Sequence, residues 1–150
     1  MGSHYAGSPK ETRALNAYIK LLRSTQSVTR RISAHRAVTD LSSSQFGALE
    51  ALYHLGPLPQ KTIGEKLLVS KSNVVAIVDT LERCAFVKRR QDLDDRRIVN
   101  VSITEEGCAY IERTLPLHVH AIAQEFGCLT APEQDELARL CRKLGLGEGA

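Results

Sequence analysis

Two groups of side chains in the middle of the chain have types and spacing that suit contact with a polyanion. The first shares one face of an expected helix over residues 71–84. At about 100° per residue, that face holds Ser72, Asn73, Ala76, Asp79, Thr80 and Arg83, with Ser70 and Lys71 at its start. Asparagine can pair with adenine, lysine can reach guanine or phosphate, and alanine or threonine can touch a thymine methyl group. These residues predict a helix that reads base edges in a DNA major groove.

The second group is a set of cations around a short acidic segment. Lys88, Arg89, Arg90, Arg96 and Arg97 flank Asp92, Asp94 and Asp95. Strand-like segments at 86–90 and 98–103 bracket these charges, which predicts a β-hairpin with its tip at 91–97. An arginine at such a tip can enter a minor groove while neighbouring cations bind phosphates. Because carboxylates oppose DNA, we predict that Asp95 pairs with Arg97 and fixes its orientation.

Both groups also have simpler interpretations. Any amphipathic helix with a solvated polar face would carry similar residues, and a charged hairpin can be a solvated loop. The order of the two groups favours DNA binding, because a cationic hairpin directly follows a helix whose first turn is small and polar. That order is the layout of a winged helix-turn-helix.

Hydrophobic spacing predicts the elements that position these residues. Residues 59–68 and 71–84 are expected as two short helices, with Ser70 as the N-cap of the second. The buried side of the second helix is apolar, consisting of Val74, Ile77, Val78 and Leu81. Gly64 supplies the small residue that a close crossing of two helices requires.

Longer helices are expected on both sides of this region. Residues 9–34 and 42–56 predict the first two helices, and Thr104 and Thr130 are N-caps of two later ones. Pro116 is expected to kink or break the fifth helix just before that residue. The expected fold is mainly α with a small β-wing, consisting of about six helices and a two- to three-stranded antiparallel sheet.

Composition and charge place the chain in a broad class. Hydrophobic residues make up 43% and charged residues 25% of the 150 residues, values typical of a soluble globular protein. The net charge is +3, yet residues 1–60 hold seven basic against three acidic side chains, and residues 105–150 hold four against eight. The first two-thirds of the chain therefore suit a polyanion better than the last third.

The sequence also indicates where the protein works. No apolar run approaches the roughly 18 residues of a membrane span, and the first residues hold no apolar signal core. Residues 1–4 (MGSH) resemble an expression-vector remnant. We therefore expect a cytoplasmic location and no membrane partner.

Catalytic and metal chemistry find little support in the sequence. It holds no nucleophile elbow, phosphate-binding glycine loop or H-E-x-x-H motif, so we expect no enzyme, no catalytic residue and no cofactor. His118 and His120 would point about 200° apart on a continuous helix, so no metal site is expected.

The four cysteines, Cys84, Cys108, Cys128 and Cys141, form no C-x-x-C pair. We expect them to be reduced, small apolar residues in or near the core. Two alternatives remain open beside the DNA-binding interpretation. One is a metal- or oxidant-responsive sensor that uses cysteine or histidine, and the other is a protein-interaction module without DNA, which leaves the basic hairpin unexplained.

Four motifs taken together resemble the MarR family (multiple antibiotic resistance regulators): VSKSNV at 69–74, VDTLER at 78–83, DLDDRR at 92–97 and SITEEG at 102–107. The resemblance is close over residues 41–107 and extends to the flanking helices by pattern only. It implies a winged helix-turn-helix transcriptional regulator, expected to be a repressor. By the family motif, Asp95 and Arg97 are the wing's Asp-x-Arg pair, and Arg97 is the minor-groove residue.

The resemblance also implies an organisation for the single regulator domain at 1–150. Residues 41–104 would form the DNA-binding lobe, and residues 9–40 and 105–146 a helical region that makes a homodimer on a pseudo-palindromic operator. The residues expected in the dimer interface are Leu15, Ile19, Leu22, Leu117, Ile122, Phe126, Leu137, Leu140 and Leu144. A monomeric bundle is the alternative. A small aromatic or phenolic effector is expected between the dimer region and the lobe.

Three departures from the family pattern limit what the resemblance implies. Val75, Ala76 and Thr80 stand where many relatives carry Thr, Arg or Gly, and Arg, so the recognised DNA sequence does not transfer. Ala85 replaces a common glycine, so a residue without glycine's tolerance of positive φ must make that turn. The first helix lacks the reactive cysteine of the hydroperoxide-sensing branch.

Overall fold

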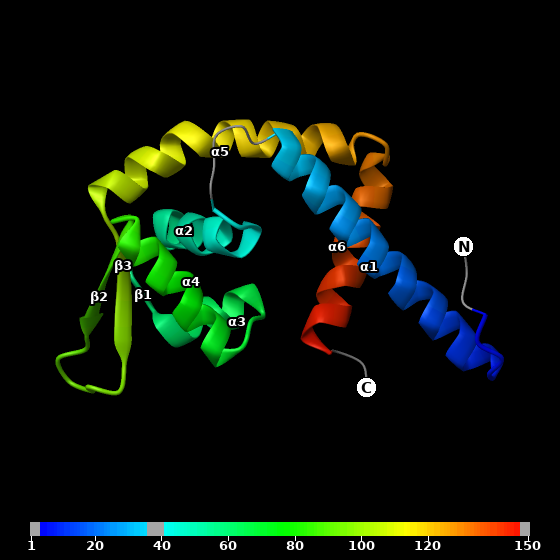
Figure 1. The fold of residues 1–150 in the computed structure, drawn as a ribbon, viewed down its shortest axis with the longest axis horizontal. Helices are drawn as coiled ribbons and strands as arrows, with labels where there is room; N and C mark the ends of the chain where they lie inside the picture. The colour runs from blue at the N-terminus through cyan, green and yellow to red at the C-terminus, as the bar shows by residue number, and fades with distance from the viewer. Residues whose placement is uncertain (1–3, 36–40, 148–150) are drawn as a thin grey trace.

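The computed structural model describes residues 4–35 and 41–147 (Figure 1). Its elements are α1 (Pro9–His35), α2 (Ser43–Leu55), β1 (Leu58–Pro59), α3 (Gln60–Leu67), α4 (Lys71–Arg83), β2 (Val87–Gln91), β3 (Val99–Ile103), α5 (Glu105–Phe126) and α6 (Ala131–Leu146). Within these ranges there are six helices and one antiparallel sheet in the order β1-β3-β2. The predicted fold class is confirmed.

A compact lobe holds α2, α3, α4 and the sheet. Figure 1 shows these elements gathered beneath the first half of α5, whereas α1 and α6 lie toward its other end. The buried side chains of the lobe come from every layer, and include Phe46, Leu49, Leu52, Ile63, Val78, Leu81, Val87, Val101 and Ile111. This apolar core fixes α4 and the β2–β3 hairpin on one scaffold.

Local capping explains where the helices begin. The Ser70 hydroxyl accepts a hydrogen bond from the Asn73 amide at 3.3 Å, and the Thr104 hydroxyl accepts one from the Gly107 amide at 3.0 Å. At α6 the Thr130 amide donates to the Glu133 carboxylate at 2.8 Å. The N-cap positions predicted from the sequence are confirmed, because each group satisfies donors that a helix start leaves unpaired.

Pro116 does not break the fifth helix. α5 runs without interruption from Glu105 to Phe126 and follows an arc across the top of Figure 1. Of the two outcomes expected at Pro116, a break is therefore wrong. Proline removes one backbone hydrogen bond, and buried side chains on both sides of it, Thr114 and Ala121, hold the two halves in place.

β1, a strand whose position the sequence did not predict, includes Pro59, where the sequence predicted the start of α3. Leu58 pairs with Val101 and Pro59 with Asn100. Pro59 is therefore a strand residue and the N-cap of α3, not its first residue. The short edge strand tolerates proline, which has no amide to donate to a ladder.

Candidate nucleic-acid interface

The crossing of α3 and α4 depends on a small residue. A Cβ atom added at Gly64 would lie 3.3 Å from the Val74 side chain, tighter than most contacts in proteins. The turn between the helices passes through Leu68, whose φ of 53° is left-handed, and the Val69 amide closes it on the Gly64 carbonyl at 3.0 Å. The predicted helix-turn-helix crossing at Gly64 is confirmed.

The outer face of α4 is open to solvent at its N-terminal end. Lys71, Ser72, Asn73 and Ala76 are exposed. Thr80 is half-buried, and its hydroxyl donates to the Ala76 carbonyl at 3.1 Å. The first two turns of α4 therefore present small side chains that allow a close approach to another surface.

The hairpin tip is organised by one carboxylate. Asp92 Oδ1 accepts from the amides of Asp94 and Asp95 at 3.0 and 3.1 Å, and its Oδ2 accepts from the Asn100 amide group at 3.0 Å. These hydrogen bonds, those from the Asp95 and Asp94 amides first, lower the pKa of Asp92 below its usual 3.8. The sequence showed Asp92 only as an acidic tip residue, and the structure shows that it holds the tip closed.

Asp95 and Arg97 form the pair expected from the sequence. Arg97 Nε donates to Asp95 Oδ1 at 2.9 Å and Nη2 donates to Oδ2 at 2.8 Å. The side chain of Arg97 is nevertheless 90% exposed. Hydrogen bonds from the Arg97 side chain and amide lower the pKa of Asp95, and the carboxylate raises the pKa of Arg97. A charged guanidinium is thus oriented and still presented outward.

The lowered pKa values predict how the tip responds to acid. A carboxylate with a depressed folded-state pKa contributes stability that is present above its unfolded pKa and is lost as pH falls through the folded value. We expect Asp92 and Asp95 to titrate below 3.8 in the folded protein, so the tip keeps its hydrogen bonds at neutral pH. Carboxyl-carbon NMR titration measures both midpoints. Midpoints no lower than in a peptide of residues 88–100 would contradict the assigned bonds.

The predicted wing cations differ in their exposure and contacts. Lys88, Arg90 and Arg96 are exposed, as Arg97 is. Arg89 instead turns toward α4, where its guanidinium bonds to Asp79 and Glu82. Charge alone grouped Arg89 with the DNA contacts, whereas in the structure its guanidinium contacts acceptors within the protein.

Two hollows flank the start of α4 and add residues that the sequence did not single out. One, of about 650 Å³, lies between α3, α4 and the tip end of β3, and its cations are Lys61, Lys71 and Arg97. The other, of about 300 Å³, includes Ser44 of α2 beside Asn73. Ser44 is the second residue of α2 and Lys61 the second residue of α3, and no spacing pattern in the sequence tied them to α4.

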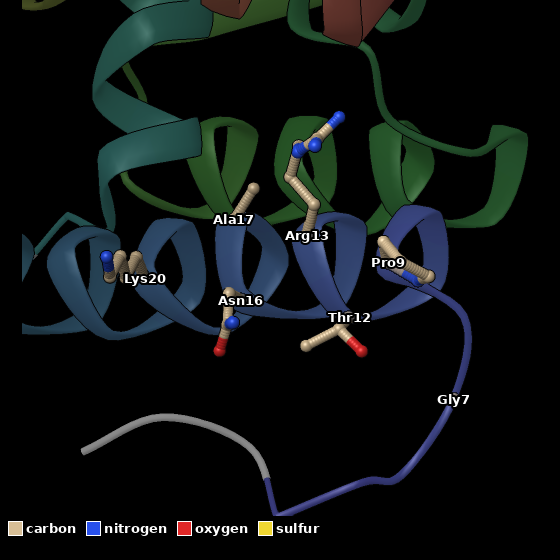
Figure 2. Close-up of a pocket in the computed structure, with 7 residues that line it drawn as sticks. All are labelled: Gly7, Pro9, Thr12, Arg13, Asn16, Ala17 and Lys20. Atoms are coloured by element: carbon tan, nitrogen blue, oxygen red, sulfur yellow. The ribbon is translucent and has the colours of Figure 1, made fainter.

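A further open groove, of about 700 Å³, runs along the first half of α1 beside Gly7. Figure 2 shows its helical residues along one stretch of α1, with Arg13 directed away from Thr12 and Asn16. The groove is formed by α1 and the segment before it, and no residue of α4 or the hairpin lines it.

The helices expected to make a dimer carry exposed apolar residues. Every described residue of α6 is exposed, and Leu144 is 66% exposed. The other predicted interface residues that are exposed are Leu22, Leu117, Leu137 and Leu140, whereas Leu15, Ile19, Ile122 and Phe126 are half-buried. Leu137, Leu140 and Leu144 thus form an apolar stripe on α6 that residues 4–35 and 41–147 of a single chain leave exposed.

The cysteines differ from the prediction. Cys84, Cys128 and Cys141 are exposed thiols, and Cys108 is half-buried. A position in or near the core is therefore wrong for three of them, because they lie at helix ends or on α6, where none of the described residues covers them. Among residues 4–35 and 41–147, no group of three or more His, Cys, Asp or Glu side chains could hold a metal ion. No helix in the same ranges is long and apolar enough to cross a membrane.

Sequence comparison decides the family. A family model described as MarR family matches residues 41–99. YkoM, an HTH-type transcriptional regulator of Bacillus subtilis, is 35% identical over 134 residues, which are 89% of this chain and 87% of YkoM. This chain belongs to the MarR family. This MarR-family chain is therefore a transcriptional regulator that binds DNA.

Solved structures of MarR-family proteins have the same fold. Sco3205 of Streptomyces coelicolor, solved in complex with DNA, has a TM-score of 0.83 at 20% identity and covers 99% of this chain and 94% of its own. BpsR of Bordetella bronchiseptica has a TM-score of 0.68 at 23% identity, covering 83% and 98%. The DNA binding of BpsR is regulated by 6-hydroxynicotinic acid. At these identities the likeness concerns the fold.

Proposed function

We propose that this regulator is a sequence-specific repressor that binds a pseudo-palindromic operator as a homodimer, in the cytoplasm. α4 lies in the major groove, and Arg97 enters the adjacent minor groove. The observation that carries the proposal is the Asp95–Arg97 pair, because it aims an exposed guanidinium from a hairpin fixed beside α4. Lys71, Lys88, Arg90 and Arg96 contact phosphates and set the register on the duplex.

The uncovered stripe of α6 supports the homodimer. Leu137, Leu140 and Leu144 follow one another at helical spacing and are all exposed. Apolar surface contributes roughly 25 cal/mol per Å² when it is removed from water, so a second copy that covers this stripe is favoured. Two lobes roughly 34 Å apart would then reach successive major grooves on one face of a duplex.

An effector completes the proposal. The DNA binding of BpsR, which shares the fold, is regulated by 6-hydroxynicotinic acid, an aromatic acid. We place a small aromatic or phenolic effector between the lobe and the dimerisation helices of this regulator. Binding there would change the separation of the two lobes and release the operator.

Titration of labelled duplexes at two salt concentrations tests the proposal. Duplexes from the promoter of the protein's own gene should bind with a steep dependence on salt and resist an unrelated competitor. Failure to bind any such duplex at low salt, or binding that every competitor removes equally, would contradict sequence-specific regulation.

Asn73→Ala and Lys71→Ala should have different effects. Loss of Asn73 removes a base contact, so discrimination between operator and unrelated DNA should fall while non-specific affinity stays nearly constant. Loss of Lys71 removes a phosphate contact, so affinity should fall on all sequences and the salt slope should decrease by about 1. Anisotropy titrations on both duplexes measure the two effects. An equal loss on both duplexes for Asn73→Ala would make Asn73 a phosphate contact.

A further inference from the structure

The guanidinium of Arg89 makes hydrogen bonds to groups on α3 and α4. Nε donates to Gln60 Oε1 at 2.9 Å, Nη2 donates to the Val75 carbonyl at 3.1 Å, and Nη1 bonds to the carboxylates of Asp79 and Glu82. The Arg89 amide also donates to Glu82 Oε1 at 3.2 Å. One side chain of β2 therefore binds the first residue of α3 and three positions of α4.

The three positions on α4 form one side of that helix. Val75, Asp79 and Glu82 follow at spacings of four and three residues. They border the apolar side of α4, whose packing is not directional and by itself would tolerate a small rotation about the helix axis. On β2, Arg89 pairs with the fully buried Val101 of β3, the central strand of the sheet. The backbone of Arg89 is therefore held by the core while its side chain contacts α3 and α4.

We propose that Arg89 is a positioning residue for DNA reading, which sets the rotation of α4 relative to the wing. The proposal rests on the proposed roles of α4 and Arg97. When the rotation of α4 is fixed, the distance between its base-reading face and the Arg97 guanidinium is also fixed. Both groups can then contact one duplex at the same time. The planar arginine fork suits this task, because it binds several acceptors in fixed directions, whereas a lysine ammonium is a point charge on a flexible stem.

Charge neutralisation is a second effect of Arg89 that the test must separate. Asp79 and Glu82 are 50% and 42% exposed, and their negative charges stand on a helix that approaches DNA. Arg89→Lys keeps a positive charge beside both carboxylates but cannot make the four-way contact. A loss in this variant therefore reports geometry and not charge.

The experiment compares wild type, Arg89→Lys and the control Arg113→Lys, the same substitution at an exposed arginine of α5 that lies outside the proposed DNA contacts. Each binds an operator recovered from random DNA and a scrambled duplex. We expect Arg89→Lys to lose about tenfold in operator affinity with nearly unchanged affinity for scrambled DNA, and Arg113→Lys to keep the wild-type affinity for both duplexes. When Arg97→Ala is already present, Arg89→Lys should cause a smaller loss of operator affinity. The reason is that part of the Arg89→Lys effect arises from a misplaced Arg97 guanidinium, which the double variant lacks.

Asp79→Asn provides a second variant that keeps Arg89. It removes a negative charge, so affinity for scrambled DNA should rise slightly. Because it also weakens the contact with Arg89, the ratio of operator affinity to scrambled-DNA affinity should fall. Two results would overturn the positioning role. One is a wild-type ratio of operator affinity to scrambled-DNA affinity in both Arg89→Lys and Asp79→Asn. The other is an equal loss of affinity for both duplexes at an unchanged melting temperature. Wild-type protein that bound both duplexes equally would instead overturn the proposed function on which this role rests.

Discussion

Leu140→Glu is expected to make the regulator monomeric and to lower its affinity for a palindromic operator by about a hundredfold or more. Leu140 is 47% exposed at the centre of the α6 stripe, between Leu137 and Leu144. In the proposed dimer a second copy covers this position, and a charge without a partner there would be strongly destabilising. Once the copies separate, each half-site must be bound alone, and the gain from joining two binding events on one duplex is lost.

Light scattering measures the mass of the variant, and anisotropy measures its affinity for full and half operators. Ala138→Glu is the matched control, because it adds the same charge on a different side of α6. It should remain a dimer with wild-type affinity. A Leu140→Glu protein that stayed dimeric with unchanged operator affinity would contradict the assignment of α6 to the interface.

Arg97→Ala is expected to weaken operator binding by roughly one to two orders of magnitude and to leave the dimer intact. Arg97 is the one wing cation that Asp95 holds by two parallel bonds, at 2.9 and 2.8 Å. Its removal costs the minor-groove contact, and it also leaves the Asp95 carboxylate without that partner beside a phosphate backbone. The side chain is on the surface, so the fold should be unaffected.

Anisotropy on one operator duplex measures this loss, with Arg96→Ala as a neighbouring control. Because Arg96 is proposed to bind phosphate, its loss should be smaller and similar on operator and unrelated DNA. Unchanged operator affinity for Arg97→Ala would refute the role assigned to the wing.

Local patterns predicted the elements of the lobe well. The helical spacing of Val74, Ile77, Val78 and Leu81 placed the buried side of α4, and all four are buried. Ala85, expected to make a turn that relatives build with glycine, does so with a φ of 62°. These features depend on neighbours a few residues apart, which a single sequence displays.

Features that depend on distant partners could not be read in the same way. Arg89 looked like another wing cation, and its acceptors Gln60 and Val75 lie 29 and 14 residues away along the chain. Pro116 predicted a kink or a break because proline alone disfavours helix, and α5 nevertheless continues through it, with buried side chains on both sides. Three cysteines were expected in or near the core, yet they lie on surfaces of this chain.

Sequencing the DNA that the purified protein selects from a random pool tests the central claim most directly. We predict one enriched pseudo-palindrome whose half-sites are centred about 10–10.5 base pairs, or a multiple of that spacing, apart. The Asn73→Ala variant should enrich a more degenerate version of it. Selection that yields no enriched sequence, from a protein confirmed to be folded, would contradict the account of α4 and the wing as a sequence-specific reader.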